Sequence, residues 1–146
     1  MAVTDMSFQE KITWLFGAVS ICTGAAYFGI VVARAQHTPV AEVAYVWPMV
    51  WALVACLGAM ILGSLAIYLA WPQDRGRTDQ RDREIERYGN YVGQVLASFC
   101  VLAALILAMR KADYFWIANT IYLGCFLSGL LGAIVKIVIY HVGFRR

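Results

Sequence analysis

The chain has 146 residues, of which 62% are hydrophobic and 14% are charged, with a net charge of +3 and a mean hydropathy of +0.67. Soluble domains are about 45–50% apolar and about 25% charged. The composition therefore excludes a soluble globular domain, a disordered chain and a protein that binds nucleic acid directly. It predicts an integral membrane protein with a single membrane domain over residues 1–146.

Four apolar stretches follow one another along the chain, at about 12–33, 46–70, 91–109 and 114–139. Each has roughly the 20 residues that a helix needs to cross a bilayer. The stretches are unbroken and lack the alternating polarity of transmembrane β-strands. We therefore expect an all-α membrane protein built as a four-transmembrane-helix bundle.

Lysine and arginine are distributed unevenly between the two sides of this arrangement. With both termini and the loop at 72–90 on one side, that side carries eight of these residues outside the spans, against three on the other side. Short cytoplasmic loops are enriched in lysine and arginine. We therefore expect a multi-pass protein of the bacterial cytoplasmic (inner) membrane with both termini in the cytoplasm.

The second and fourth spans share the spacing Y-x-W-x8-C-x6-G, which begins at Tyr45 in one and at Tyr114 in the other. This match predicts two helical hairpins in the same orientation, which is a parallel repeat of the kind found in some transporters. Chance similarity among small and aromatic residues is the alternative.

All four spans carry small residues at spacings of three or four, which let helix backbones approach closely in lipid. In the first span these residues are Ala18, Cys22, Ala25, Gly29 and Ala33; in the second, Ala52, Cys56, Ala59, Gly63 and Ala66; in the third, Gly89, Gly93, Ala97, Cys100, Ala104 and Ala108; and in the fourth, Gly124, Ser128 and Gly132. We expect these faces to pack, and a face left uncovered would suit a homodimer.

One cysteine falls near the middle of each span, at Cys22, Cys56, Cys100 and Cys125. Four cysteines can bind zinc, but four ionised sulfurs would be costly at the bilayer centre. Packing is therefore the preferred interpretation. His37 and His141 fall on opposite sides of the membrane and cannot pair on a haem. No catalytic or nucleotide-binding motif occurs, so we expect no cofactor and no enzyme.

Three intramembrane polar residues are candidates for a role beyond packing, namely Lys136, Gln94 and Asn119. Lys136 lies near the end of its span, where a lysine commonly extends to the headgroups. The alternative is that it faces the bundle and meets Gln94 or a carboxylate of the middle loop. Gln94 and Asn119 lie towards opposite ends of their spans, so we expect each to make its own interhelical hydrogen bond.

Residues 72–90 hold 10 of the 21 charged side chains and carry no net charge. Opposite charges spaced three or four apart support a helix, so we expect the third helix to begin near residue 79, well before its apolar part. A solvated, self-paired helix end is one interpretation. The other is a docking surface for a partner, with candidates Asp79, Arg81, Asp82, Arg83, Glu84, Glu86 and Arg87.

The loop sequence Asp79-Gln80-Arg81-Asp82-Arg83-Glu84-Ile85 resembles the D-E-R-D-x-x-I motif of a bacterial family of short, uncharacterised four-helix membrane proteins common in actinobacteria. The segments 38–42 and 115–119 and the region around Lys136 also resemble that family, so the likeness covers nearly the whole chain. Gln80 stands where the family usually has glutamate. The family is often encoded beside small helix-turn-helix regulators, which implies a regulatory pairing and no catalytic activity.

Two functions compete on this basis. The first is a small non-enzymatic, regulatory membrane protein whose charged middle loop engages a cytoplasmic partner, such as a transcription regulator. The alternative is a small homo-oligomeric transporter or channel, which the parallel repeat favours. The lack of an ionisable residue in mid-membrane counts against it, whereas a polar cavity between the helices would favour it.

Overall fold

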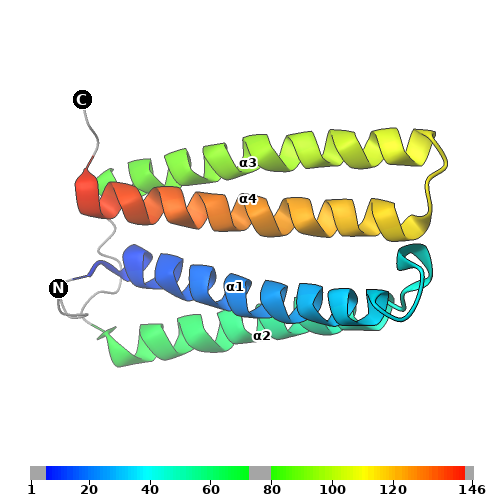
Figure 1. Cartoon of the computed structure of the whole chain (residues 1–146). Helices are drawn as coiled ribbons and strands as arrows, with labels where there is room; N and C mark the ends of the chain where they lie inside the picture. The colour runs from blue at the N-terminus through cyan, green and yellow to red at the C-terminus, as the bar shows by residue number, and fades with distance from the viewer. Residues whose placement is uncertain (1–5, 73–79, 144–146) are drawn as a thin grey trace.

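The computed structural model describes residues 6–72 and 80–143. Figure 1 shows its four long helices, which are α1 (Phe8–Ala35), α2 (Val46–Ala70), α3 (Gln80–Met109) and α4 (Tyr114–Val142). A single turn of 3-10 helix, η2 (Val40–Glu42), interrupts the connection between α1 and α2. All four long helices are long and apolar enough to cross a membrane. The chain is therefore a multi-pass, all-α membrane protein with four helices, as the sequence predicts.

The helices alternate in direction, so that α1 and α3 begin at the end of the bundle where α2 and α4 finish (Figure 1). We call this end the inner end, because the lysine and arginine count predicts that it is cytoplasmic, and we call the opposite end the outer end. The hairpins α1–α2 and α3–α4 thus have the same orientation.

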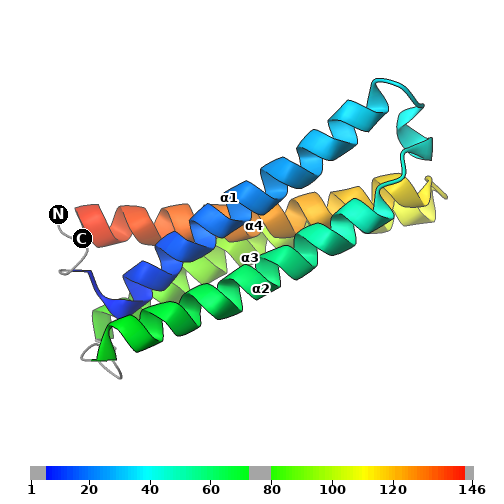
Figure 2. The same ribbon diagram turned by 90° about the horizontal axis from the view of Figure 1, so that it is seen from below.

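Contacts between the helices follow the spatial order α2, α1, α4, α3. Helix α3 packs along α4, α4 packs along α1, and α1 packs along α2 (Figures 1 and 2). A two-fold axis along the membrane normal would relate α1 to α3 and α2 to α4. It would therefore require α2 to pack on α3 as extensively as α4 packs on α1, and the described residues form no such interface. The repeat is therefore one of helix direction and not of helix packing.

Glycines bring the backbones of α3 and α4 into close contact. A Cβ atom added at Gly93 would lie 2.6 Å from the carbonyl oxygen of Ser128, and one added at Gly132 would lie 3.0 Å from that of Gly89. Gly124 faces Cys100 in the same way. Small residues at a helix interface permit this approach in lipid, where no hydrophobic force joins the helices. The predicted packing faces of the third and fourth spans are confirmed.

The small-residue face predicted for the first span is wrong. Its members are exposed, and a Cβ added at Gly29 would meet nothing within 4 Å. The buried face of α1 is instead made by Thr13, Gly17, Ser20, Gly24, Tyr27 and Val31. Gly24 leaves the space that the ring of Phe126 occupies. The chain thus has two small-residue stripes on α1, and the one with room for the aromatic rings of α4 is buried.

Helix α2 is the least covered of the four, with no buried residue along its length. Its one close glycine contact joins Gly63 to the side chain of Leu15 on α1. Pro48 is its third residue, in the first turn, where the missing N–H has no helical partner to lose. Pro48 is thus compatible with the start of α2, and α2 is attached to the bundle mainly through α1.

The tight turn between α3 and α4 contains a residue in the left-handed region, Lys111, with a φ of 56°. Its N–H donates to the carbonyl of Ala108, and that of Ala112 donates to the carbonyl of Leu107. This pair of bonds is the Schellman ending, in which glycine is the favoured residue at the position of Lys111. The turn therefore holds a side chain in a conformation that costs about 1–2 kcal/mol.

Replacing Lys111 with glycine is expected to raise the free energy of unfolding by about 1 kcal/mol, because glycine adopts this conformation without a steric penalty. Thermal unfolding in detergent would measure the gain. Ala112→Gly is the control, because Ala112 has no positive φ and glycine there adds only freedom to the unfolded chain. A Lys111→Gly protein no more stable than the wild type would contradict the expectation.

Candidate functional site

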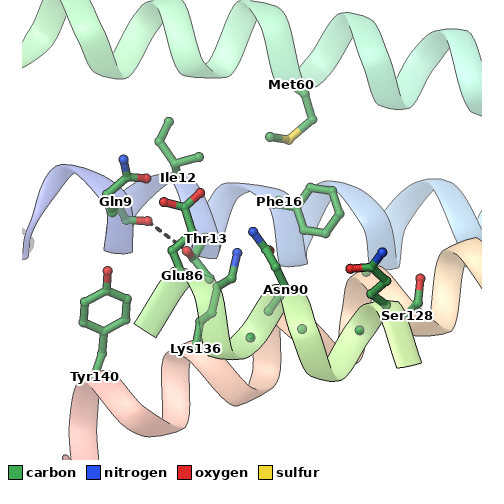
Figure 3. A pocket seen from close by; sticks show the side chains of 16 residues that line it. Gln9, Ile12, Thr13, Phe16, Met60, Glu86, Asn90, Ser128, Lys136 and Tyr140 are labelled. Carbon is green, nitrogen blue, oxygen red and sulfur yellow. Dashed lines mark hydrogen bonds between the residues drawn. The ribbon is translucent and has the colours of Figure 1, made fainter. Parts of the chain in front are cut away.

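A pocket of about 440 Å³ lies among the four helices in the inner half of the bundle (Figure 3). We call it the interhelical pocket. It is lined by Gln9, Ile12, Thr13 and Phe16 of α1, Met60 of α2, Glu86, Gly89, Asn90, Gly93 and Gln94 of α3, and Ser128, Gly129, Gly132, Ala133, Lys136 and Tyr140 of α4. Met60 and Ser128 are near the middle of their helices. The pocket thus extends from the inner end to the centre of the bundle.

The hollow exists because one part of its wall has almost no side chains. Gly89 and Gly93 on α3 face Gly132 on α4, and their backbones touch. The aliphatic stem of Lys136 lies against Gly89, where an added Cβ would come within 2.4 Å of its Cγ. The glycines therefore direct the lysine across the surface of α3 instead of along α4 to the headgroups.

Two opposite charges line the pocket, Glu86 from α3 and Lys136 from α4 (Figure 3). Both side chains are half-buried, and the carboxylate of Glu86 attracts the ammonium of Lys136 electrostatically. Gln94 lines the same pocket. The structure thus brings Lys136, Gln94 and a charge of the middle loop to one place, which is the arrangement that the sequence leaves as the alternative to a lysine extended to the headgroups.

The remaining polar side chains supply acceptors and donors of hydrogen bonds. The hydroxyl of Thr13 donates to the carbonyl of Gln9 at 2.8 Å, and that of Ser128 donates to the carbonyl of Cys125 at 3.0 Å. Because each hydroxyl hydrogen is used within its own helix, the oxygens are left as acceptors. The amide of Asn90 adds both kinds of group to the lining.

Aromatic rings close the bundle beyond the pocket, towards the outer end. We call the set Tyr27, Phe28, Tyr45, Phe115, Tyr122 and Phe126 the aromatic seal. The ring centroids of Tyr27 and Tyr122 are 4.4 Å apart, and those of Tyr45 and Phe115 are 5.2 Å apart. Tyr27 and Phe115 belong to the buried core there. The pocket in the inner half is therefore followed by a packed layer of rings towards the outer end.

Asn119 lies beside the aromatic seal and does not line the interhelical pocket. Its Oδ1 atom accepts a hydrogen bond of 2.5 Å from the hydroxyl of Tyr27, and its Nδ2 atom donates to the carbonyl of Phe115. The interhelical hydrogen bond expected for Asn119 is thus present, and Asn119 lies apart from Gln94, as expected.

Removing the hydroxyl in Tyr27→Phe is expected to lower the free energy of unfolding by about 0.5–2 kcal/mol, which is the range for interhelical hydrogen bonds in membranes. The loss arises because Tyr27 is only 1% exposed, so the oxygen of Asn119 would have no replacement partner. Thermal unfolding in detergent would test this, with Tyr114→Phe as control because that ring is 85% exposed. Equal midpoints for the two variants would contradict it.

The charged residues of the middle loop separate into three groups. Arg81, Arg83, Glu84 and Arg87 are exposed, Glu86 lines the pocket, and Asp82 is buried with 7% of its surface exposed. The third helix begins at Gln80, as expected, and Asp79 lies outside the described residues. The sequence shows the charges but not this division, which depends on which side of α3 meets α4.

Asp82 belongs to a polar cluster that joins three helices at the inner end. Ser7, which caps α1, donates to Asp82 Oδ1 at 3.5 Å and accepts from the N–H of Glu10 at 3.2 Å. The hydroxyl of Tyr140 on α4 lies close enough to Ser7 and Asp82 to interact with both. We call Ser7, Asp82 and Tyr140 the inner cluster. It fixes the beginnings of α1 and α3 against the end of α4, beside the pocket.

Lysine and tryptophan connect α2 to the same end. The ammonium of Lys11 lies 4.5 Å from the centroid of a Trp71 ring, which is the geometry of a cation–π contact. Lys11 and Glu10 are both buried. Within residues 6–72 and 80–143, every buried side-chain nitrogen or oxygen has a hydrogen-bond partner, so the polar groups at the inner end are accommodated.

The cysteines do not converge. Cys22 and Cys125 are exposed, and Cys56 and Cys100 are partly buried. The described residues contain no group of three or more histidine, cysteine, aspartate or glutamate side chains that could hold a metal ion.

Comparisons with protein-family models, with curated proteins and with solved structures find no match to this chain. The resemblance to the bacterial four-helix family stays a prediction.

Proposed function

We propose that this protein is a small transporter that binds a polar, zwitterionic solute in the interhelical pocket. The observation that carries the proposal is the presence of a glutamate and a lysine in one pocket that reaches the middle of the bundle. Lys136 lies within the apolar fourth span, and ionisable side chains at membrane depth are costly and mark substrate or ion pathways by default. The sequence contains no charge at the exact centre of a span, but the glycine face of α3 lets Lys136 reach across the bundle.

The chemistry of the lining supports the choice of a zwitterion. Glu86 can accept hydrogen bonds from a cationic group, and Lys136 can donate to an anionic group. A solute that carries both charges replaces the attraction between the two side chains without leaving either charge unpaired. A solute with only one charge would pair with either Glu86 or Lys136. The charge of the other side chain would then be half-buried without a partner, which is unfavourable.

The position of the pocket supports transport over simple binding. Transporters hold the solute near the bilayer midplane, and here a polar pocket reaches the middle of the bundle from the inner half, while packed aromatic rings lie between α1 and α4 in the outer half. Helix α2 packs mainly on α1. Movement of the hairpin α1–α2 against α3–α4 would therefore mainly rearrange the interface of α1 with α4, together with the contacts between η2 and α4.

The proposal is tested by thermal unfolding of the detergent-purified protein with a panel of amino acids and betaines, set against simple carboxylates, amines and sugars. A ligand at 100 times its Kd stabilises the folded state by about 2.7 kcal/mol. We expect a zwitterion to raise the unfolding midpoint, and the same solute to exchange across proteoliposomes that contain the protein.

Glu86→Gln and Lys136→Gln should each remove the stabilisation, because each deletes one of the two charges. Lys111→Gln is the matched control, since Lys111 is exposed in the turn at the other end of the bundle. Stabilisation only by singly charged solutes, or stabilisation that survives both pocket variants, would overturn the proposal.

A second candidate is the regulatory role, in which a cytoplasmic protein docks on the charged beginning of α3. What favours it is that Arg83, Glu84 and Arg87 are exposed on a regular helix, so the pattern of charge is fixed in space. Co-purification of a regulator, lost in the triple alanine variant of these three residues and retained in Arg110→Ala, would support this role. Retention in the triple variant would remove it.

Membrane and assembly belong to the same proposal. We propose a bacterial inner membrane because of the resemblance to the bacterial four-helix family, and we propose that the inner end is cytoplasmic because of the lysine and arginine count. Reporter fusions to the C-terminus would test this orientation. The predicted homo-oligomer stays a prediction, for which the uncovered α2 is the candidate surface, and the mass of the protein in detergent would decide it.

A further inference from the structure

A second hollow, of about 610 Å³, lies between α1 and α2 in the outer half of the bundle. We call it the outer groove. Its walls include Cys22, Ala26 and Arg34 of α1 and Trp47, Trp51 and Ala55 of α2. The outer groove shares no lining residue with the interhelical pocket, so the two hollows are separate.

The groove forms because α1 and α2 spread apart towards the loop that joins them, as Figure 2 shows. Small side chains such as Ala26, Ala52 and Ala55 line the space between them. Large rings stand at its edge, where Trp47 is 72% exposed and Trp51 is 67% exposed. A hollow with apolar walls at this depth is open to the hydrocarbon of the bilayer.

Arg34 gives the groove a charged end. It lies in the last turn of α1, and one guanidinium nitrogen donates to the carbonyl of Ala44 in the loop. This bond holds the side chain over the groove, and the other guanidinium N–H groups are left to bind an anion, since arginine has five in all. Arg34 is the one basic residue among those that line the groove.

The length of the groove matches one leaflet. From Cys22 to Arg34 the helix rises by about 18 Å at 1.5 Å per residue, and half of a hydrocarbon core of about 30 Å is about 15 Å. Arg34 therefore lies at the headgroup level when Cys22 lies near the midplane. Trp47, exposed at the same end, is a residue type that prefers that interface.

The geometry points to a bound anionic phospholipid in the leaflet at the outer end, with its phosphate on Arg34 and one acyl chain along the outer groove. Guanidinium groups bind phosphate with paired, charge-assisted hydrogen bonds. Basic pockets between transmembrane helices bind anionic lipid headgroups on the cytoplasmic side of membranes, and Arg34 supplies the same chemistry at the outer end. A neutral detergent or lipid tail alone would fill the groove without using the arginine.

The test is native mass spectrometry of the protein released from nanodiscs that contain equal amounts of phosphatidylglycerol and phosphatidylcholine. We expect one retained lipid per chain, with phosphatidylglycerol preferred about tenfold. Arg34→Gln should abolish the preference, and Ala26→Leu, which fills the groove, should reduce retention of both lipids. Arg110→Gln is the matched control, because Arg110 lies at the same end outside the groove.

Two further experiments distinguish a bound lipid from bound free phosphate. Glycerol phosphate added in excess should not displace the lipid, because it lacks the acyl chain; displacement would show a site for free phosphate and overturn the proposal. In a variant that keeps Trp51 as its only tryptophan, phosphatidylglycerol with brominated chains should quench fluorescence more than brominated phosphatidylcholine. Equal quenching by both lipids, or equal retention in the wild type and Arg34→Gln, would also overturn it.

Because Arg34 also binds the loop, its variant could lose lipid through a change of fold. Ala26→Leu leaves that bond in place, so it tests the groove independently. Wild-type retention of both lipids in a folded Ala26→Leu protein would overturn the placement of the acyl chain.

Discussion

Replacing Gly93 with alanine is expected to lower the free energy of unfolding by about 1–3 kcal/mol, the usual cost of overpacking an interior. The new Cβ would lie 2.6 Å from the carbonyl oxygen of Ser128, which belongs to the backbone of α4. A backbone atom cannot turn aside as the end of a side chain can, so α3 and α4 must separate along their interface. Thermal or denaturant-induced unfolding in detergent micelles would measure the loss.

Gly29→Ala is the matched control. It is the same substitution in a membrane helix, but a Cβ added at Gly29 has no atom within 4 Å. Alanine favours a helix over glycine by about 1 kcal/mol, so this variant should be as stable as the wild type or more stable. A Gly93→Ala protein that gains stability as Gly29→Ala does would show that α3 and α4 are not in backbone contact.

Substituting alanine for Asp82 is expected to cost about 1–3 kcal/mol, the range for breaking a buried hydrogen-bonding group. The substitution deletes the acceptor of Ser7 and removes the carboxylate that interacts with Tyr140. The beginnings of α1 and α3 would then lose their shared connection to α4. We expect a lower unfolding midpoint and faster proteolysis near the beginning of α1.

Glu84→Ala removes the same charge two residues away, from an exposed position, and should leave stability within about 0.5 kcal/mol of the wild type. The pair also separates the two roles of this segment. Asp82→Ala should weaken the fold, whereas Glu84→Ala should weaken only binding of a partner. Equal stability of the two variants would contradict a structural role for Asp82.

The four helices could be predicted from hydropathy because lipid leaves the backbone few alternatives to a helix. The extra turns of α3 before its apolar part were also predictable, from the spacing of opposite charges. The face that each helix buries was less accessible, as α1 illustrates. Periodicity finds a stripe of small residues, but only the shape of the partner decides between two stripes on one helix.

The pocket could have been recognised in part. Glu86, Asn90 and Gln94 are spaced by four residues and therefore lie on one face of α3, and Lys136 and Tyr140 have the same spacing on α4. The capping pattern Ser7-x-x-Glu10 marks the beginning of α1. No sequence pattern shows that these faces converge, because that depends on the order of the helices in space.

The position of α4 between α1 and α3 has a consequence for biogenesis. The hairpin α1–α2 and the helix α3 leave the ribosome before α4 exists, and they have little contact with each other. Until α4 inserts, the glycine face of α3 has no partner. The order of synthesis therefore delays packing of the four helices until α4 is present, and the hollow at the centre of the bundle is formed only then.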